Sequence, residues 1–142
     1  MDRLTKERLV AEAIAARQKS YCPYSHFAVG AALLTAEGRI YTGANIECAS
    51  HTPTVCAERV AFFRAVHQGE RRFVAIAVAG GGEGREVEFA CAPCGVCRQV
   101  MAEFCDDAFA VLLTDGKETR EYTLGQILPL RFGPEDLDRA DV

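Results

Sequence analysis

Two short segments of this chain carry residue types that bind metals. They are Cys56-Ala57-Glu58-Arg59 and Pro93-Cys94-Gly95-Val96-Cys97, and each is predicted to lie where a helix begins. Helix N-termini favour ionised cysteine, because unpaired amides and the positive end of the helix dipole lie there. If the two helices lie side by side, Cys56, Cys94 and Cys97 can bind one Zn²⁺ and leave its fourth position open, as in catalytic zinc sites.

Glu58 and Arg59 follow the first cysteine directly and suit the surroundings of such a metal. Three thiolates give the site a net negative charge, which opposes ionisation of a bound water. The Arg59 guanidinium can offset this charge by donating to the sulfurs. Glu58 can line the cavity without binding the metal and carry protons between water and substrate, a role that contributes roughly 10²–10⁴-fold to the rate.

Composition limits the class of partner. The chain has 142 residues, a net charge of −4 and scattered basic residues, so we expect a small substrate and no nucleic acid. No apolar run is long enough for a membrane span, and the N-terminus has no signal-peptide pattern. Seven cysteines, an odd number, argue against a disulfide framework and favour reduced thiols in the cytoplasm. We expect one catalytic domain over residues 1–142.

Periodicity and turn signals predict alternating helices and strands. Thr54 is the expected N-cap of the second helix, Gly69 lies past its end, and Gly80 to Gly84 are expected to form a flexible loop. The order indicates an α/β fold with three layers, α/β/α, around a mixed central sheet. The predicted helices are 4–19, 55–67 and 94–104, and the predicted strands are 27–35, 39–44, 73–79 and 109–113, followed by a short strand, a helical turn near residue 124 and a polar tail.

Several stretches, taken in order, resemble the small homotetrameric zinc-dependent cytidine deaminases over nearly the whole chain. A lone Cys-x-x-Cys pair would be weak evidence, whereas this ordered set is specific. The matching stretches are residues 24–33, Asn45-Ile46-Glu47, Cys56-Ala57-Glu58-Arg59, residues 93–99, Leu128-Pro129 and residues 132–137.

The resemblance implies roles for residues that pattern alone would not select. Phe27 would stack on the pyrimidine, and Asn45 and Glu47 would hydrogen-bond the ribose hydroxyls. The backbone amide of Ala57 would bind the carbonyl of the base, and Phe132 would reach the active site of a neighbouring subunit. On pattern alone Phe27 reads as a core residue, and Asn45 and Glu47 read as solvated loop residues.

The resemblance also implies a reaction and an assembly. We expect hydrolytic deamination of cytidine and 2′-deoxycytidine to uridine and 2′-deoxyuridine, with release of ammonia, as in pyrimidine salvage. Glu58 would protonate the ring nitrogen of the base. One zinc per chain, a homotetramer, a cytoplasmic location and the fold of the cytidine deaminases are implied as well.

Two alternatives remain open. Cys91, Cys94 and Cys97 form Cys-x₂-Cys-x₂-Cys, which with Cys56 or Cys105 would suit a four-cysteine zinc or iron–sulfur binding module. A related zinc deaminase that acts on a modified cytosine nucleoside is the nearer alternative.

Two departures from the family pattern bear on that nearer alternative. Cys48 and His51 stand where the family usually has asparagine and tyrosine, which predicts a roomier and less polar sugar side of the pocket.

Overall fold

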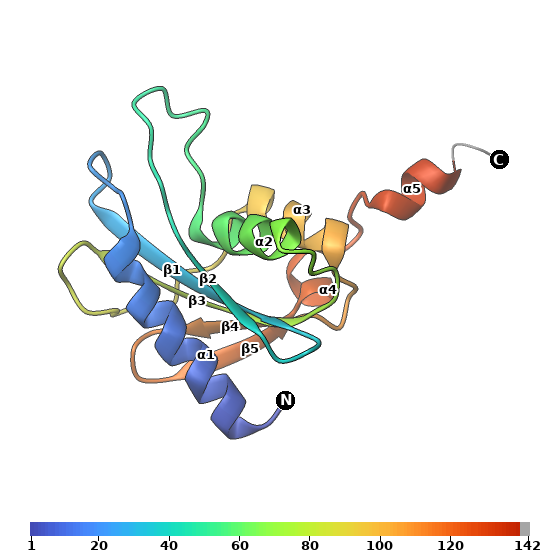
Figure 1. Cartoon of the computed structure of the whole chain (residues 1–142), viewed down its shortest axis with the longest axis horizontal. Coiled ribbons are helices and arrows are strands. Elements are labelled where there is room, and N and C mark those ends of the chain that lie inside the picture. The colour runs from blue at the N-terminus through green and yellow to red at the C-terminus, as the bar shows by residue number, and fades with distance from the viewer. Residues whose placement is uncertain (140–142) are drawn as a thin grey trace.

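The computed structural model describes residues 1–139, which form one five-stranded sheet with helices on both faces (Figure 1). Strand order is β2-β1-β3-β4-β5, and all neighbouring strands are antiparallel except the parallel pair β3 and β4. In chain order the elements are α1 (Arg3–Ala16), the 3₁₀-helix η1 (Arg17–Lys19), β1 (Phe27–Thr35), β2 (Ile40–Ala44), α2 (Ala57–His67), β3 (Phe73–Gly82), α3 (Gly95–Phe104), β4 (Ala110–Thr114), β5 (Thr119–Thr123), α4 (Leu124–Ile127) and α5 (Pro134–Arg139).

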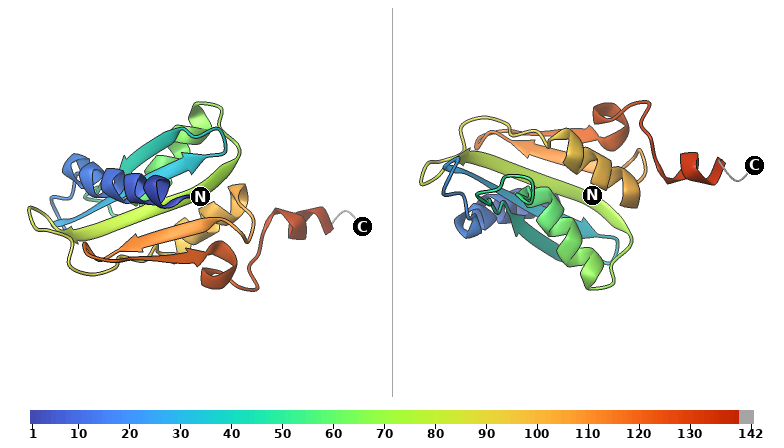
Figure 2. Two further views of the ribbon diagram at one scale, coloured as in Figure 1. Left: turned by 90° about the horizontal axis from the view of Figure 1, so that it is seen from below. Right: turned by 90° about the horizontal axis from the view of Figure 1, so that it is seen from above.

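Alternating side chains of the central strands face opposite layers, because successive residues of a strand point to opposite faces of its sheet. One set packs with α2 and α3, and the other packs with α1. The two views of Figure 2 show α1 on one side of the sheet and α2 and α3 on the other. The predicted α/β fold with three layers and a mixed sheet is therefore confirmed. On the α2/α3 side the strand residues are Ala31, Leu33, Ile76, Val78, Val111 and Leu113, and on the α1 side they are Ala32, Leu34, Ala75, Ala77, Ala79, Ala110 and Leu112.

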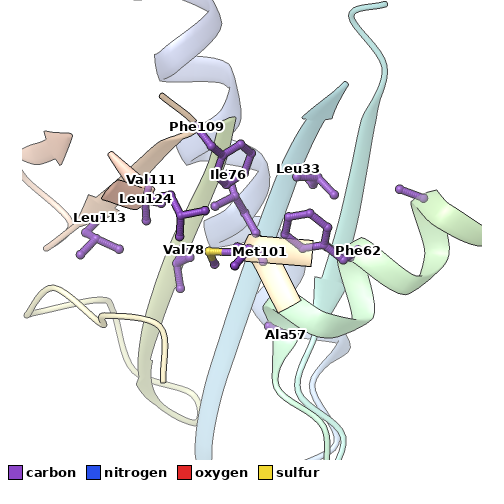
Figure 3. Close-up of a cluster of buried hydrophobic side chains, with 14 residues drawn as sticks. Leu33, Ala57, Phe62, Ile76, Val78, Met101, Phe109, Val111, Leu113 and Leu124 are labelled. Atoms are coloured by element: carbon purple, nitrogen blue, oxygen red, sulfur yellow. The ribbon is translucent and has the colours of Figure 1, made fainter. Parts of the chain in front are cut away.

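The larger side chains of the core lie under α2 and α3 (Figure 3). Phe62 of α2 is fully buried, and its ring centroid lies 5.2 Å from that of Phe73 and 6.0 Å from that of Phe104 in α3. These aromatic contacts, together with buried Met101 of α3, hold the two helices against the sheet. Truncation of such a core phenylalanine typically costs about 3–5 kcal/mol of folding free energy. The packing of α2 and α3 on the sheet thus holds the N-termini of both helices in fixed positions.

A glycine in β2 lets α2 come close to the sheet. A Cβ atom at Gly43 would lie 2.4 Å from the carbonyl oxygen of Ala57 and 2.5 Å from the amide nitrogen of Ala61. No larger residue fits there without moving the first turn of α2. Gly43 therefore sets the depth of the turn that carries Glu58 and Arg59.

Two local predictions are wrong. The first is the flexible loop over Gly80 to Gly84, because Gly80, Gly81 and Gly82 continue β3 and pair with Val29, Ala28 and Phe27 of β1. Composition suggests a loop there, but a Cβ at Gly80 would lie 2.7 Å from the sulfur of Cys91. A glycine is needed at position 80 because the segment that carries Cys91 packs directly on the strand.

The second wrong prediction concerns the start of α2. Its N-cap is Cys56, not Thr54, whose hydroxyl oxygen instead accepts a hydrogen bond from the Cys48 amide at 2.9 Å. The other predicted helices and strands are present with ends shifted by a few residues, and the tail includes α5. Gly69 does lie past the end of α2, with a φ of +95°. In the described part of the chain no helix has the length and apolar character needed to cross a membrane.

Candidate active site

The sulfur atoms of Cys56, Cys94 and Cys97 converge where α2 and α3 begin. Cys56 and Cys94 are the N-cap residues of the two helices, and Cys97 lies in the first turn of α3. The Sγ atoms of Cys56 and Cys94 are 3.8 Å apart, those of Cys94 and Cys97 are 3.5 Å apart, and all three lie within 4.8 Å of one another. Neither N-cap sulfur bonds to the amides of its own helix. The three sulfurs are thus available to a shared ligand.

These distances fit a tetrahedral zinc ion. A Zn–S length of about 2.3 Å with tetrahedral angles places neighbouring sulfurs about 3.8 Å apart. The donor set is three soft thiolates, which also suits zinc. In the part of the chain that the structure describes, Cys91 and Cys105 are not in this group, so a fourth sulfur does not close the site.

The thiols of Cys56 and Cys97 ionise unequally. Hydrogen bonds from Cys97, Arg59 and Cys94 lower the pKa of Cys56 to about 5, against the effect of burial. The resulting hydrogen bond to Cys56 and burial raise the pKa of Cys97 above its ordinary value. A thiolate at Cys56 therefore forms readily, and a dication favours ionisation of Cys97 beside it.

Arg59 lies against the sulfurs. Its Nη2 atom donates to the Sγ atom of Cys56 at 3.4 Å. Burial disfavours the charged guanidinium, but hydrogen bonds and charge from Cys56 and Cys97 outweigh it and raise the pKa of Arg59. Its Nε atom is buried and has no hydrogen-bond partner among residues 1–139. Arg59 thus lies where its charge can offset that of the thiolates.

Glu58 is a buried carboxyl group in the first turn of α2, with 4% of its surface exposed. Burial is the main cause of its pKa rising to about 7, and the charge of Cys56 adds to the effect. A carboxyl group that titrates near neutral pH can both accept and release a proton, which is what general acid–base catalysis needs.

Cys91 lies close to the metal-binding cysteines without joining them. Its sulfur packs on Gly80 of β3, and burial raises its pKa to about 11, with the charges of Glu58 and Cys56 adding to the effect. A thiol held in its neutral form is a poor metal ligand. Cys91 is thus a half-buried free thiol that lies outside the group of three sulfurs.

Phe27 has an aromatic partner that the sequence did not indicate. Its ring stacks with that of Phe89, with centroids 6.0 Å apart and planes at 26°. Phe89 lies on the connection between β3 and α3 and is 52% exposed. Phe89 lies in an irregular segment, where no periodicity indicates a role for a single aromatic residue. The only signal in the sequence is its position five residues before Cys94.

Asn45 is buried and ties the loop after β2 to its surroundings. Its Oδ1 atom accepts hydrogen bonds from the Ser20 hydroxyl at 2.6 Å and the Val29 amide at 2.9 Å. Its Nδ2 atom donates to the carbonyl oxygen of Phe27 at 2.8 Å. One amide hydrogen of Asn45 remains after these three bonds.

Glu47 receives three hydrogen bonds from the turn ahead of Phe27. Its Oε1 atom accepts from the amides of Tyr24 at 3.1 Å and Ser25 at 3.0 Å, and its Oε2 atom accepts from the Ser25 hydroxyl. The bonds from Ser25 are the main cause of a lowered pKa, so Glu47 is ionised. Its Oε2 atom keeps a lone pair that these bonds do not use.

The structure does not bring Phe132 to the sulfur cluster of its own chain. Phe132 is 60% exposed and lies after Leu130, in a tail that runs out from the body of the molecule to α5 (Figure 1). The side chain of Gln99 donates a hydrogen bond to the backbone carbonyl of Phe132 at 2.8 Å. Its side chain is thus presented outward.

Comparisons with known proteins decide the family. Residues 4–113 match the family model described as the cytidine and deoxycytidylate deaminase zinc-binding region, and this range includes both cysteine motifs. A cytidine deaminase from Sporosarcina psychrophila is 49% identical over 135 residues, which cover 94% of this chain and 96% of that protein. The chain belongs to the cytidine deaminase family.

Further relatives agree over nearly the whole length. The cytidine deaminase from Halalkalibacterium halodurans is 46% identical over 95% of this chain and 99% of its own. The crystal structure of the Burkholderia pseudomallei cytidine deaminase has a TM-score of 0.82 and 43% identity, covering 93% of this chain and all of that one. Zinc is the cofactor of this deaminase-family chain, and its cysteine cluster fits the ion.

Proposed function

We propose that this chain deaminates cytidine and 2′-deoxycytidine by hydrolysis, giving uridine and 2′-deoxyuridine and releasing ammonia. The observation that carries the proposal is a buried carboxyl group, Glu58, directly beside three sulfurs arranged for one zinc ion. A closed structural zinc site or an iron–sulfur module has no use for a buried carboxyl that is not a ligand.

Cys56, Cys94 and Cys97 would hold the zinc ion, which would supply a Lewis acid that lowers the pKa of water. Glu58 takes the proton of the attacking water and passes it to N3 of the cytosine ring while the oxygen adds at C4. A second proton transfer through Glu58 to the amino group lets ammonia leave. The sum is nucleoside plus water giving the uracil nucleoside plus ammonia.

The hydrogen-bonding groups of Asn45 and Glu47 that are not used within the described chain complement a hydroxyl. Asn45 has one unused amide hydrogen, and Glu47 has one unused lone pair, after their bonds within the described residues are counted. A ribose hydroxyl can accept from the first and donate to the second. Cytidine and 2′-deoxycytidine both have a 3′-hydroxyl, so both are expected to bind this pair.

The base is held by an aromatic face and a helix N-terminus. Phe27 offers its ring for stacking, and Phe89 keeps that ring in place. Ala57 is the first residue of α2, where a backbone N–H has no acceptor within the helix. That amide can donate to the carbonyl oxygen of the base and orient C4 toward the sulfur cluster.

The proposed active unit is a homotetramer that works in the cytoplasm, in pyrimidine salvage. The outward side chain of Phe132 and the fully exposed Leu130, on a tail with little packing of its own, support a site completed by a neighbouring subunit. Truncation before Leu130 is expected to weaken both assembly, seen by light scattering, and turnover. A fully active monomer would contradict this part of the proposal.

A panel of cytosine compounds tests the reaction. Ammonia release is compared by kcat/KM for cytidine, 2′-deoxycytidine, 2′,3′-dideoxycytidine and cytosine. The first two are expected to react well and the last two poorly, because a site built to bond a hydroxyl leaves its polar groups unpaired when the hydroxyl is missing. Equal rates for the dideoxy compound or the free base would point to a different deaminase.

A further inference from the structure

The turn that follows β3 is fixed in place by Arg17, the first residue of the 3₁₀-helix η1. The Arg85 amide donates to the Gly82 carbonyl at 3.0 Å, and Gly84 has a φ of +76°, so residues 82–85 form a closed turn. The Arg17 guanidinium donates to the carbonyl oxygens of Gly82 and Arg85, both at 3.0 Å, and to that of Ala28 at 2.9 Å. The residue at the corner of this turn, Glu83, therefore has a fixed backbone.

Glu83 makes three contacts with the segment that leads into β1. Its amide donates to the His26 carbonyl at 2.7 Å, which continues the β1/β3 pairing by one residue. Its Oε2 atom accepts from the thiol of buried Cys22 at 3.5 Å, and its Oε1 atom lies 3.3 Å from Nδ1 of His26. His26 has a φ of +56°, a conformation that needs support from its surroundings.

The same segment is held from its other side by Glu47. The carboxylate of Glu47 accepts from the amides of Tyr24 and Ser25 and from the Ser25 hydroxyl. Residues 22–26 thus lie between two carboxylates, Glu47 from the loop after β2 and Glu83 from the connection after β3. The next residue is Phe27, whose ring stacks on Phe89 of that same connection.

We propose that Glu83 is a positioning residue for nucleoside binding. It holds the segment 22–26 so that Ser25 orients Glu47 and so that Phe27 stays against Phe89. The inference rests on the proposed function, in which Glu47 binds the sugar and Phe27 binds the base. Glu83 touches neither substrate nor metal, and its effect passes through Ser25 and Phe27.

The steady-state test replaces Glu83 by alanine and uses Glu88→Ala as a matched control. Glu88 is an exposed carboxylate of the same connection, with no side-chain hydrogen bond or ion pair within residues 1–139. Glu83→Ala is expected to raise KM for cytidine about three- to tenfold, with kcat, zinc content and melting temperature nearly unchanged. Glu83→Gln, which keeps an acceptor for Cys22, is expected to recover much of the loss.

A second readout does not depend on turnover. The amides of Tyr24 and Ser25 are expected to exchange with solvent about three- to tenfold faster in Glu83→Ala and at the normal rate in Glu88→Ala. The KM effects of Glu83→Ala and Ser25→Ala are expected to be less than additive, because both act on Glu47.

The outcomes separate the two proposals. An active wild-type chain with unchanged KM and unchanged amide exchange in Glu83→Ala would overturn the role of Glu83 and leave the reaction standing. A wild-type chain that releases no ammonia from cytidine would overturn the proposed function, whatever the exchange rates show. Equal shifts in kcat and melting temperature would make Glu83 a structural residue and would also overturn the inference.

Discussion

Glu58 and Glu70 are both buried, with 4% and 6% of their surfaces exposed, but their carboxyl groups have opposite surroundings. Glu70 accepts hydrogen bonds from Nη2 of Arg39 at 3.0 Å and from the Tyr41 hydroxyl at 2.9 Å, and the bond from Arg39 is the main cause of its lowered pKa. Within residues 1–139 no such cation is bound to Glu58, and burial raises its pKa to about 7.

Arg59, which follows Glu58 in the chain, and Arg39, which binds Glu70, differ in the same way. Arg39 binds Glu70 through both Nε and Nη2, whereas the Nε atom of Arg59 is buried without a partner in the described residues. Buried polar groups are normally satisfied, and an exception asks for an explanation. A satisfied cluster stabilises the fold, while the unsatisfied cluster around Glu58 is arranged for a metal and a substrate. The difference separates a structural glutamate from a functional one within one chain.

The largest effect is expected from the sulfurs beside Glu58. Cys56→Ser should abolish both zinc binding and activity, because a catalytic zinc site with two remaining thiolates is incomplete. Cys91→Ser should retain zinc and most activity, since its neutral thiol packs on Gly80 and lies outside the cluster. Zinc is measured by atomic absorption and activity by ammonia release. Full loss of zinc from Cys91→Ser would favour a four-cysteine site and would contradict the distinction between Cys91 and the three clustered cysteines.

A matched pair of arginine variants comes next. Arg59→Gln should lower kcat or zinc affinity roughly 10–100-fold, the usual cost of removing a group that supports metal ligands. Arg39→Gln should lower the melting temperature and leave kcat and zinc content nearly unchanged, because it leaves Glu70 buried without its cation. If both variants lost activity equally with no change in melting temperature, the distinction between the two clusters would fail.

The smallest effect is a pH dependence of stability. The pKa of Glu70 is lowered from the ordinary value near 4.5 by its bond to Arg39. The stabilisation from this pair is therefore fully present above about pH 4.5 and is lost as the pH falls through the lowered folded value. Denaturant unfolding of wild type and Glu70→Gln should give stabilities that differ at neutral pH and converge in acid. A constant difference across this range would show that the carboxylate charge contributes nothing.

Local patterns were enough to predict that Cys56, Cys94 and Cys97 come together. The motifs around Cys56 and Cys94 lie at helix starts, and both helix starts depend on short-range signals that a sequence displays. The meeting of the two helix N-termini follows from a three-layer fold, which strand and helix order indicates. Each motif depends on residues near one another in the chain, and the fold then brings the three sulfurs together.

Residues defined by distant contacts could not be predicted in this way. Glu70 follows Gly69 in a short turn, and nothing local shows that it is buried against Arg39 of the hairpin. Phe89 stacks on Phe27, Gly80 continues β3 by pairing with Val29 of β1, and the sulfur of Cys91 leaves no room for a Cβ atom at Gly80. These contacts join segments that only the folded chain brings together.

The variants Glu58→Gln and Glu70→Gln test most directly whether Glu58 is the proton carrier of the site. Both are measured for kcat on cytidine, zinc content and melting temperature. Glu58→Gln should keep zinc and its melting temperature but lose at least about 10²-fold in kcat, because an amide cannot carry protons. Glu70→Gln should show the reverse, with a lower melting temperature and nearly normal kcat. Near-normal turnover in Glu58→Gln would contradict the central claim that this buried carboxyl is the proton carrier of the site.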